Sequence, residues 1–415
     1  MRADPRHRAG DTPPIYGDGK RDTNDELPGG TMTVEGTCTD QFQPVRDALS
    51  QLIDSDQDIG ASAAVVLNGE LVVDLWGGHL DEARTTPWER DTLVNVFSTT
   101  KTMTNLCALL LADRGELDVD ATVATYWPEF KANGKEEIRV RHLLSHTSAL
   151  SGWEEPLEVA DLYDWEKCTS LLAAQAPWWE PGTKSGYHAV TQGYLVGEVV
   201  RRITGQSLGS FFAAELADPL GADFHIGTGP ELDDRVSLLL NPPEIRLEDI
   251  EELAPDADRE ILIKTLLNPV MSGAMSWPVE WRRAEIPAAN GQGNARSVAI
   301  VQAVMSNHGE MNGKRFLSED GCQRVFTEQS DGTDLVLGVP LRFGIGYGLP
   351  NELMAFPSPN TCFWGGYGGS LVLNDLDSRM TIAYVMNKMG SGTLGDERGA
   401  SIVLAAYGGL LGAIS

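Results

Sequence analysis

The chain has 415 residues, of which 42% are hydrophobic and 22% charged, enough for one large or two ordinary domains with a real core. Its 60 acidic residues outnumber the 32 Lys and Arg, which gives a formal net charge of −28 at pH 7. So acidic a surface repels phosphate backbones and anionic lipid headgroups. Nucleic-acid and membrane partners are therefore not expected.

The five cysteines are scattered and odd in number, without a CxxC pair or the Cys/His spacing of a zinc site. This pattern argues against a disulfide framework and a structural metal. The N-terminal residues lack the apolar run of a signal peptide, and no stretch approaches the roughly 18 apolar residues of a membrane span. We therefore expect a soluble cytoplasmic protein, and the sequence leaves its oligomeric state open.

The N-terminal part of the chain begins without any periodic pattern. Residues 1–37 are rich in Pro, Gly and charge, which predicts a flexible tail. Apolar residues at spacings of three and four predict an amphipathic helix over 42–53. Two β-rich runs, 61–67 and 70–76, flank Asn68-Gly69, a sequence typical of a tight hairpin turn.

The C-terminal part repeats this hairpin pattern. Runs 370–373 and 380–386 predict a second hairpin, and the apolar stretch 402–414 predicts a terminal helix. The middle of the chain is mostly helical, with one clear helix over 194–203. The acid-rich stretch 244–260 is expected to be a solvated helix or loop.

Strands at both ends with a helical middle predict an α+β fold, in which both ends of the chain build one mainly antiparallel sheet flanked by helices. The sheet domain is expected to comprise residues 38–116 and 290–415. Residues 117–289 are expected to form an inserted, mostly helical domain.

Ser98-Thr-Thr-Lys101 is the first candidate for chemistry. The apolar spacing that follows predicts a helix, so Ser98 and Lys101 should lie one turn apart on one face, with Cβ atoms roughly 5–6 Å apart. The helix N-terminus favours negative charge on Ser98, and Lys101 becomes a base if burial lowers its pKa from ~10.4. The two residues can act as nucleophile and base. The alternative is an N-cap serine followed by a surface lysine.

A second serine, Ser207, lies in Gly205-Gln-Ser-Leu-Gly209, which matches the G-x-S-x-G nucleophile elbow. The elbow requires a strand-to-helix turn on a parallel sheet, whereas here a helix precedes the motif. Gly205 is expected to end that helix, and Ser207 to cap the next one. We therefore predict that Ser207 is not the nucleophile.

Two further segments favour a site around Ser98. Tyr187 follows the Gly-containing loop 181–186, which can present a phenol to a cleft; packing is the alternative. Trp364-Gly-Gly-Tyr-Gly-Gly369 lies directly before a strand. Clustered glycines let the backbone approach a ligand and offer a free N–H to an oxyanion, and a β-bulge or edge kink is the alternative.

With these segments in this order, the sequence resembles the serine β-lactamase and penicillin-binding-protein superfamily, and within it the class C β-lactamase-like carboxylesterases, or family VIII esterases. The similarity covers most of residues 45–410. It rests on Ser98-x-x-Lys101, on Tyr187, and on Trp364-Gly-Gly where β-lactamases carry Lys-Thr-Gly. The segments that frame these motifs are similar as well: 141–148, 179–182 and 291–296.

The resemblance implies a β-lactamase/DD-peptidase-like fold, with the site where the sheet meets the helical domain. It also implies a role for each motif residue. Ser98 would be the acyl-accepting nucleophile, and Lys101 and Tyr187 would share the proton transfers. The backbone N–H groups of Ser98 and Tyr367 would form an oxyanion hole, worth about 2.7–4 kcal/mol per donor. Water would then hydrolyse the acyl-enzyme, without a cofactor or metal.

Two departures from the β-lactamase pattern bear on the substrate. Ala189 stands where β-lactamases commonly have the Asn of Tyr-x-Asn, and Trp364 replaces the cation that would hold a β-lactam carboxylate. Both favour uncharged small-molecule esters. The residues expected to contact the substrate are Trp364, Gly365, Gly366 and His188.

The sequence therefore predicts a cofactor-free serine hydrolase that cleaves carboxylic esters. A β-lactamase or DD-peptidase, a short-amide hydrolase and an acyltransferase of the same superfamily are the alternatives. A non-catalytic binding homologue is a rival from another class, and the intact set of Ser98, Lys101 and Tyr187 weighs against it.

The remaining histidines and tryptophans receive structural interpretations. His142 and His146, four residues apart on a predicted helix, are expected to be hydrogen-bond partners rather than metal ligands. Core packing is the favoured interpretation for five tryptophans of the helical middle, with an apolar acyl pocket as the alternative: Trp153, Trp178, Trp179, Trp277 and Trp281.

Overall fold

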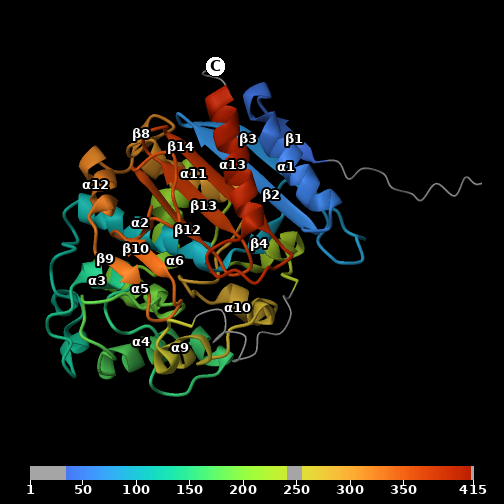
Figure 1. Cartoon of the computed structure of the whole chain (residues 1–415). Coiled ribbons are helices and arrows are strands. Elements are labelled where there is room, and N and C mark those ends of the chain that lie inside the picture. The colour runs from blue at the N-terminus through green and yellow to red at the C-terminus, as the bar shows by residue number, and fades with distance from the viewer. Residues whose placement is uncertain (1–33, 241–254, 413–415) are drawn as a thin grey trace, which may run out of the picture. The chain divides into compact units, whose positions relative to one another are not determined.

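The computed structural model describes residues 34–240 and 255–412 (Figure 1). The tail predicted over 1–37 lies outside the described residues up to position 33. Its last residues differ from the prediction, because Glu35–Cys38 forms strand β1. This strand pairs with β3 (Glu70–Gly78), a contact between distant segments that local composition does not indicate.

A nine-stranded sheet in the order β1-β3-β2-β14-β13-β12-β11-β10-β9 dominates the fold, and all its neighbouring strands run antiparallel. The other strands of this sheet are β2 (Gly60–Leu67), β9 (Ser330–Thr333), β10 (Pro340–Phe343), β11 (Gly348–Leu349), β12 (Thr361–Gly365), β13 (Leu371–Asp375) and β14 (Met380–Met386). Two smaller sheets consist of β4 (Leu93–Asn95), β5 (Val236–Ser237) and β6 (Gln292–Gly293), and of β7 (Glu310–Met311) and β8 (Lys314–Arg315).

Both predicted hairpins are confirmed, and they meet in the middle of the large sheet. Asn68 and Gly69 have φ values of +52° and +81°, as a tight turn between twisted strands requires. Strand β2 pairs with β14 along its length, from Ala61 opposite Met386 onward. The predicted α+β architecture, with an antiparallel sheet built from both ends of the chain, is therefore confirmed.

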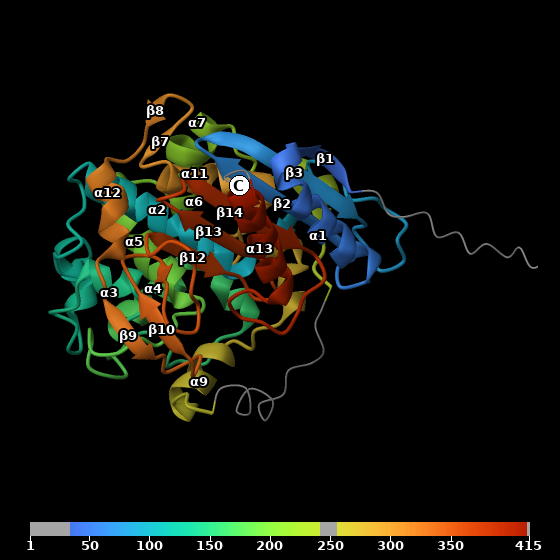
Figure 2. The same ribbon diagram turned by 45° about the horizontal axis from the view of Figure 1, so that its top comes forward.

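Helices cover both faces of this sheet. The helices α1 (Gln43–Asp54) and α13 (Glu397–Gly412) lie side by side on one face, and α11 (Ala295–Ser306) packs against β2, β13 and β14 from the other (Figures 1 and 2). As a result β14 is buried throughout, and β2 is buried except at its last residue. Strands enclosed on both faces form the core.

Outside the large sheet and the helices that cover it, the regular elements of the described chain are mainly helices. These helices are α2 (Thr100–Asp113), α3 (Val140–Leu144), α4 (Trp165–Ala174), α5 (Thr191–Thr204), α6 (Leu208–Phe212), α7 (Asp218–Leu220), α9 (Arg259–Leu266), α10 (Val279–Arg283) and α12 (Glu319–Gln323). The acid-rich stretch 244–260 lies outside the described residues up to 254. The last two residues of the stretch begin α9. Asp258 caps this helix, and its carboxylate accepts the N–H groups of Glu260 and Ile261.

The described residues form one compact unit. The predicted division into a sheet domain, 38–116 with 290–415, and an inserted domain, 117–289, stays a prediction. Within 34–240 and 255–412, no helix has both the length and the apolar character needed to cross a membrane.

Candidate active site

Ser98 lies in a sharp turn between a strand and a helix. Strand β4 leads into the short 3-10 helix Phe97–Thr99, and α2 begins directly after it. Phe97 has a φ of +42°, a strained conformation for a bulky residue. Its ring packs edge-on against Trp281 and Tyr367, which stabilises the turn. The turn presents Ser98 one helical turn before Lys101, as predicted.

Two side chains meet the hydroxyl of Ser98. Lys101 Nζ lies 2.9 Å from Ser98 Oγ, and Tyr187 donates its hydroxyl to the same oxygen at 2.6 Å. Ser98, Lys101 and Tyr187 are 7%, 1% and 3% exposed. In such a dry environment these polar contacts are stronger than at the surface. The structure thus brings together the three residues that the sequence singled out.

The surroundings of Lys101 favour its neutral form. Burial lowers the pKa of its amine well below the usual value. Besides Ser98, its Nζ faces two backbone carbonyls, Ala189 O at 2.7 Å and Ala288 O at 3.0 Å. A neutral amine has two N–H groups and one lone pair. The two carbonyls accept the two protons, and the lone pair then points at the Ser98 hydroxyl.

Tyr187 is held from its backbone side by a carboxylate that the sequence did not indicate. Its N–H donates to Asp334 Oδ1 at 3.0 Å, and the same oxygen accepts the N–H groups of Val336 and Leu337. Burial raises the pKa of the Tyr187 phenol, so its proton is retained at neutral pH. Asp334 lies 147 residues from Tyr187 in the chain, so no local pattern could have revealed the contact.

The Gly-rich loop after β12 runs along the turn that carries Ser98. A Cβ added to Gly366 would lie 2.3 Å from Val96 O and 3.3 Å from Ser98 N, so only glycine allows this approach. The N–H groups of Ser98 and Tyr367 have no hydrogen-bond partner within the described part of the chain. Neither predicted oxyanion-hole donor is therefore committed to an acceptor within the described residues.

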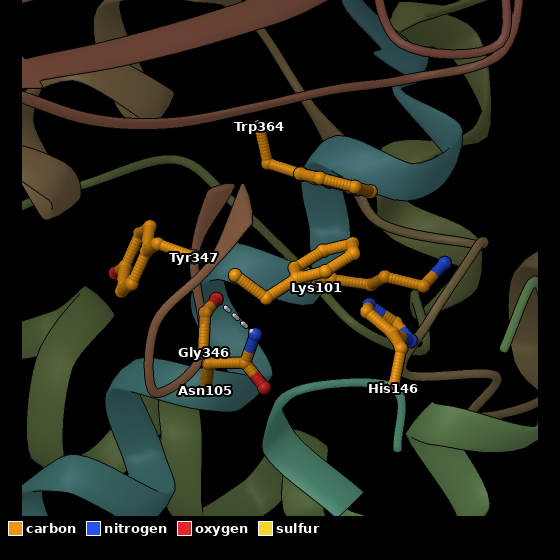
Figure 3. A pocket seen from close by; sticks show the side chains of 7 residues that line it. Lys101, Asn105, His146, Gly346, Tyr347 and Trp364 are labelled. Carbon is orange, nitrogen blue, oxygen red and sulfur yellow. Dashed lines mark hydrogen bonds between the residues drawn. The ribbon is translucent and has the colours of Figure 1, made fainter. Parts of the chain in front are cut away.

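Trp364 and a second aromatic ring lie near Lys101 (Figure 3). With Asn105, Gly346 and Tyr347, these residues line a small pocket (Figure 3). The second ring is His146, which stacks on Trp364 with centroids 5.8 Å apart and ring planes at 26°. The indole of Trp364 is 3% exposed, so it acts chiefly as a wall of the site.

His146 differs from its prediction in one respect. It lies beyond the end of α3, with a φ of +60°, and not on a helix with His142. Its Nδ1 accepts the backbone N–H of His188, and His142 Nδ1 accepts that of Arg139. Both histidines are thus hydrogen-bond partners, as expected. Sequence reasoning missed that His146 packs against Tyr187, with ring centroids 4.9 Å apart.

The substrate contact expected for His188 stays a prediction, and its side chain is held by other parts of the protein. His188 is completely buried, and Gly186 O accepts its Nδ1–H at 2.6 Å. Its Nε2 therefore carries a lone pair, which faces Ser148 Oγ at 2.7 Å and the N–H of Leu150 at 3.3 Å. Burial lowers the pKa of this imidazole to about 3. His188 braces the loop before Tyr187, and both of its ring nitrogens are occupied by groups of the protein.

Ser207 occupies the position predicted for it. Gly205, with a φ of +72°, ends α5, and Ser207 is the N-cap of α6, where its Oγ accepts the N–H of Ser210. The Ser207 hydroxyl donates to Glu285 at 2.6 Å. The Ser207 hydroxyl thus caps a helix and bonds a carboxylate, as expected of a structural serine.

The five tryptophans divide into core and surface residues. Trp153 and Trp281 are almost fully buried, in agreement with the core interpretation. Trp178 and Trp179 are half-buried, and Trp277 is 42% exposed. The ring of Trp281 packs against Phe97 in the turn of Ser98.

Comparisons with known proteins agree with this site. A protein-family model described as beta-lactamase matches residues 45–407. The esterase/beta-lactamase LipL of Mycobacterium tuberculosis is 34% identical over 367 residues, which cover 86% of this chain and 83% of LipL. Esterase EstB of Burkholderia gladioli is 33% identical over 181 residues, which cover 39% of this chain and 45% of EstB.

Similar solved structures cover nearly the whole chain. A family VIII carboxylesterase superposes with a TM-score of 0.84 at 40% identity, covering 90% of this chain and 99% of the other. A penicillin-binding-protein homologue from Caulobacter crescentus gives a TM-score of 0.82 at 34% identity, covering 91% and 99%. The predicted β-lactamase/DD-peptidase-like fold is thus confirmed. This chain belongs to the beta-lactamase family.

Proposed function

We propose that this protein is a serine hydrolase that cleaves small carboxylic esters through an acyl-enzyme on Ser98. The observation that carries the proposal is the buried contact of Ser98 Oγ with Lys101 Nζ at 2.9 Å and with Tyr187 OH at 2.6 Å. The names of similar proteins, a family VIII carboxylesterase, LipL and EstB, support ester hydrolysis.

Lys101 acts as the base in this proposal. In its neutral form it accepts the Ser98 proton while Oγ attacks the ester carbonyl carbon, and the C=O electron pair moves onto the oxygen. The two carbonyls that hold the N–H groups of Lys101 also stabilise the ammonium formed in this step, because they face the new charge.

The N–H groups of Ser98 and Tyr367 bind the oxyanion that forms on the carbonyl oxygen. Their lack of partners within the described residues supports this role. Donors fixed before the reaction need no reorganisation when the charge develops.

Tyr187 protonates the leaving alcohol oxygen, and its raised pKa keeps that proton available at neutral pH. The C–O bond of the alcohol breaks, which leaves the acyl group on Ser98 Oγ. The proton that Lys101 took from Ser98 then passes to the Tyr187 phenolate, which restores both groups. Water attacks the acyl carbon while Lys101 takes one of its protons. This proton goes to Ser98 Oγ as the bond between Oγ and the acyl carbon breaks, so the carboxylic acid leaves and Ser98 is restored.

The walls of the site favour uncharged substrates. Trp364 contributes an indole where β-lactamases have the Lys of Lys-Thr-Gly, and Ala189 contributes no amide side chain. A substrate carboxylate would therefore lose its solvation without gaining a cation at Trp364. We propose neutral esters as the preferred class, ahead of β-lactams.

The two serine motifs allow a direct test. Ser98→Ala should abolish hydrolysis of short p-nitrophenyl esters, whereas Ser207→Ala, the matched control in the G-x-S-x-G motif, should keep it. A fluorophosphonate should label Ser98, as located by peptide mass spectrometry. Ester hydrolysis by Ser98→Ala at the wild-type rate would overturn the proposal. Faster turnover of a chromogenic cephalosporin than of esters would overturn the substrate class.

A further inference from the structure

The two proposed oxyanion donors come from distant parts of the chain. Ser98 belongs to the turn before α2, and Tyr367 to the loop between β12 and β13. An oxyanion hole works only if both N–H groups converge on one point, within a few tenths of an ångström. The fold therefore needs a connection that fixes the loop to the turn.

The side chain of Ser370 makes such a connection. Its hydroxyl donates to Val96 O at 2.8 Å, and its Oγ lies 2.9 Å from Thr99 Oγ1. Since the single proton of Ser370 goes to the carbonyl, Thr99 donates its own to Ser370 Oγ. Val96 and Thr99 flank Phe97 and Ser98. The Ser370 hydroxyl therefore forms hydrogen bonds on both sides of the turn that carries Ser98.

The backbone of Ser370 also fixes the loop that carries Tyr367. Its carbonyl accepts the Gly366 N–H at 2.8 Å, and Gly366 O accepts the N–H of Gly369 at 3.1 Å. The loop passes so close to the turn that a Cβ on Gly366 would lie 2.3 Å from Ser370 Oγ. Ser370 is 1% exposed and Thr99 is fully buried, so water cannot replace their hydrogen bonds without entering the core.

We propose that the hydroxyls of Ser370 and Thr99 form a clamp that sets the spacing of the two oxyanion donors, Ser98 N and Tyr367 N. Both are positioning residues, because neither touches the reacting atoms. The inference rests on the proposed function, since it presupposes that these two N–H groups bind the oxyanion.

Removal of the clamp should impair the transition state more than substrate binding. In Ser370→Ala we expect kcat for a p-nitrophenyl ester to fall about 10–100-fold, with KM changed less than about threefold. A phenylboronic acid forms a tetrahedral adduct on Ser98 with an oxygen in the oxyanion hole. Its inhibition constant should rise by a factor similar to the fall in kcat/KM.

Ser306→Ala is the matched control. Ser306 is fully buried and pairs with Thr381 Oγ1 at 2.8 Å, the same kind of Ser–Thr contact, between α11 and β14. It should show a comparable loss of stability but wild-type kcat and boronate inhibition. If Ser370→Ala and Ser306→Ala have the same kcat at equal stability, the clamp proposal is wrong.

Thr99 provides a second test in case Ser370→Ala does not fold. Thr99→Ser keeps the hydroxyl and should stay within about threefold of wild-type kcat, whereas Thr99→Val should show the defect expected of Ser370→Ala. Equal activities of Thr99→Ser and Thr99→Val would overturn the clamp. An active Ser98→Ala would instead overturn the proposed function, so the two failures are distinguishable.

Discussion

The protonation state of Lys101 is set by its immediate neighbours. Its Nζ has two carbonyl acceptors and one hydroxyl within 3.0 Å, and burial lowers its pKa. A base with a lowered pKa is neutral, and therefore competent, above that pKa and loses competence as the pH falls through it. Without this environment, a lysine would be protonated at neutral pH.

This argument predicts the shape of the pH profile. For a neutral ester, kcat/KM should rise with pH through the lowered pKa of Lys101 and reach its plateau well below pH 10.5, the ordinary lysine value. Lys101→Arg keeps a cation but cannot release its proton, and it should lose roughly 10²–10⁴-fold in activity at every pH. Discontinuous ester-hydrolysis assays of the wild type and Lys101→Arg between pH 5 and 10 measure both pH profiles. Activity that still rises steeply at pH 10 would contradict the assignment of Lys101 as base.

Sequence reasoning found the three side chains that meet at Ser98 Oγ but not the residues that hold them and their loops in place. The spacing of Ser98 and Lys101 on a predicted helix pointed to those two residues. A Gly-containing loop before Tyr187 pointed to the third. Asp334 and Ser370 act through contacts with segments 147 and 271 residues away. Their types, a carboxylate and a hydroxyl, are common in loops. Only the folded chain reveals them.

At the level of elements, the helix ends followed simple rules. Gly205 ends α5 in the left-handed conformation, and a Cβ there would meet no atom within 4 Å. A side chain at this position would therefore strain the backbone without a steric clash. Gly408 lies inside α13, and a Cβ there would also meet open space. The two glycines therefore have opposite roles although their surroundings are equally empty.

These glycines yield a prediction on stability. Gly205→Ala should destabilise the protein by about 1 kcal/mol, because alanine disfavours positive φ. Gly408→Ala should stabilise it by about 0.5–1 kcal/mol, because alanine is the better helix former. Urea unfolding of both variants measures the difference. Changes of the same sign would show that the conformational argument does not apply.

The elements that the sequence failed to indicate are short or paired over long distances. β11 has two residues and β10 four, too few for a period of two to be visible. Strand β1 has the composition of a tail and is ordered by β3. The hairpins β2–β3 and β13–β14 were predictable because each is local and continuous.

At the scale of the whole molecule, buried neutral histidine links stability to pH. The pKa of His188 falls to about 3 on folding, from an ordinary value of 6.5. A depressed pKa means that the unfolded chain binds the proton more readily than the folded protein. Above pH 6.5 the imidazole is neutral in both states, so the full contribution of His188 to the free energy of unfolding is present there. It is lost as the pH falls towards 3.

We therefore expect the free energy of unfolding to decrease between pH 6.5 and 4, partly through His188. His188→Gln should have a shallower decrease, by roughly 1 kcal/mol per pH unit. The variant should be less stable at pH 7, because the bonds to Ser148 and Gly186 change. Denaturant titrations at several pH values measure both slopes. Parallel curves for the two proteins would show that His188 does not contribute.

The pairing of β2 with β14 also has a consequence for biosynthesis. Gly60 N–H donates to the side chain of Asn387, 327 residues later in the chain. At roughly 5–20 residues per second, a ribosome needs on the order of tens of seconds between these two points. During that time the apolar β2–β3 hairpin has one edge without its partner strand, and such edges are prone to aggregation. Translation speed and chaperone supply should therefore strongly affect the yield of this protein in a host cell.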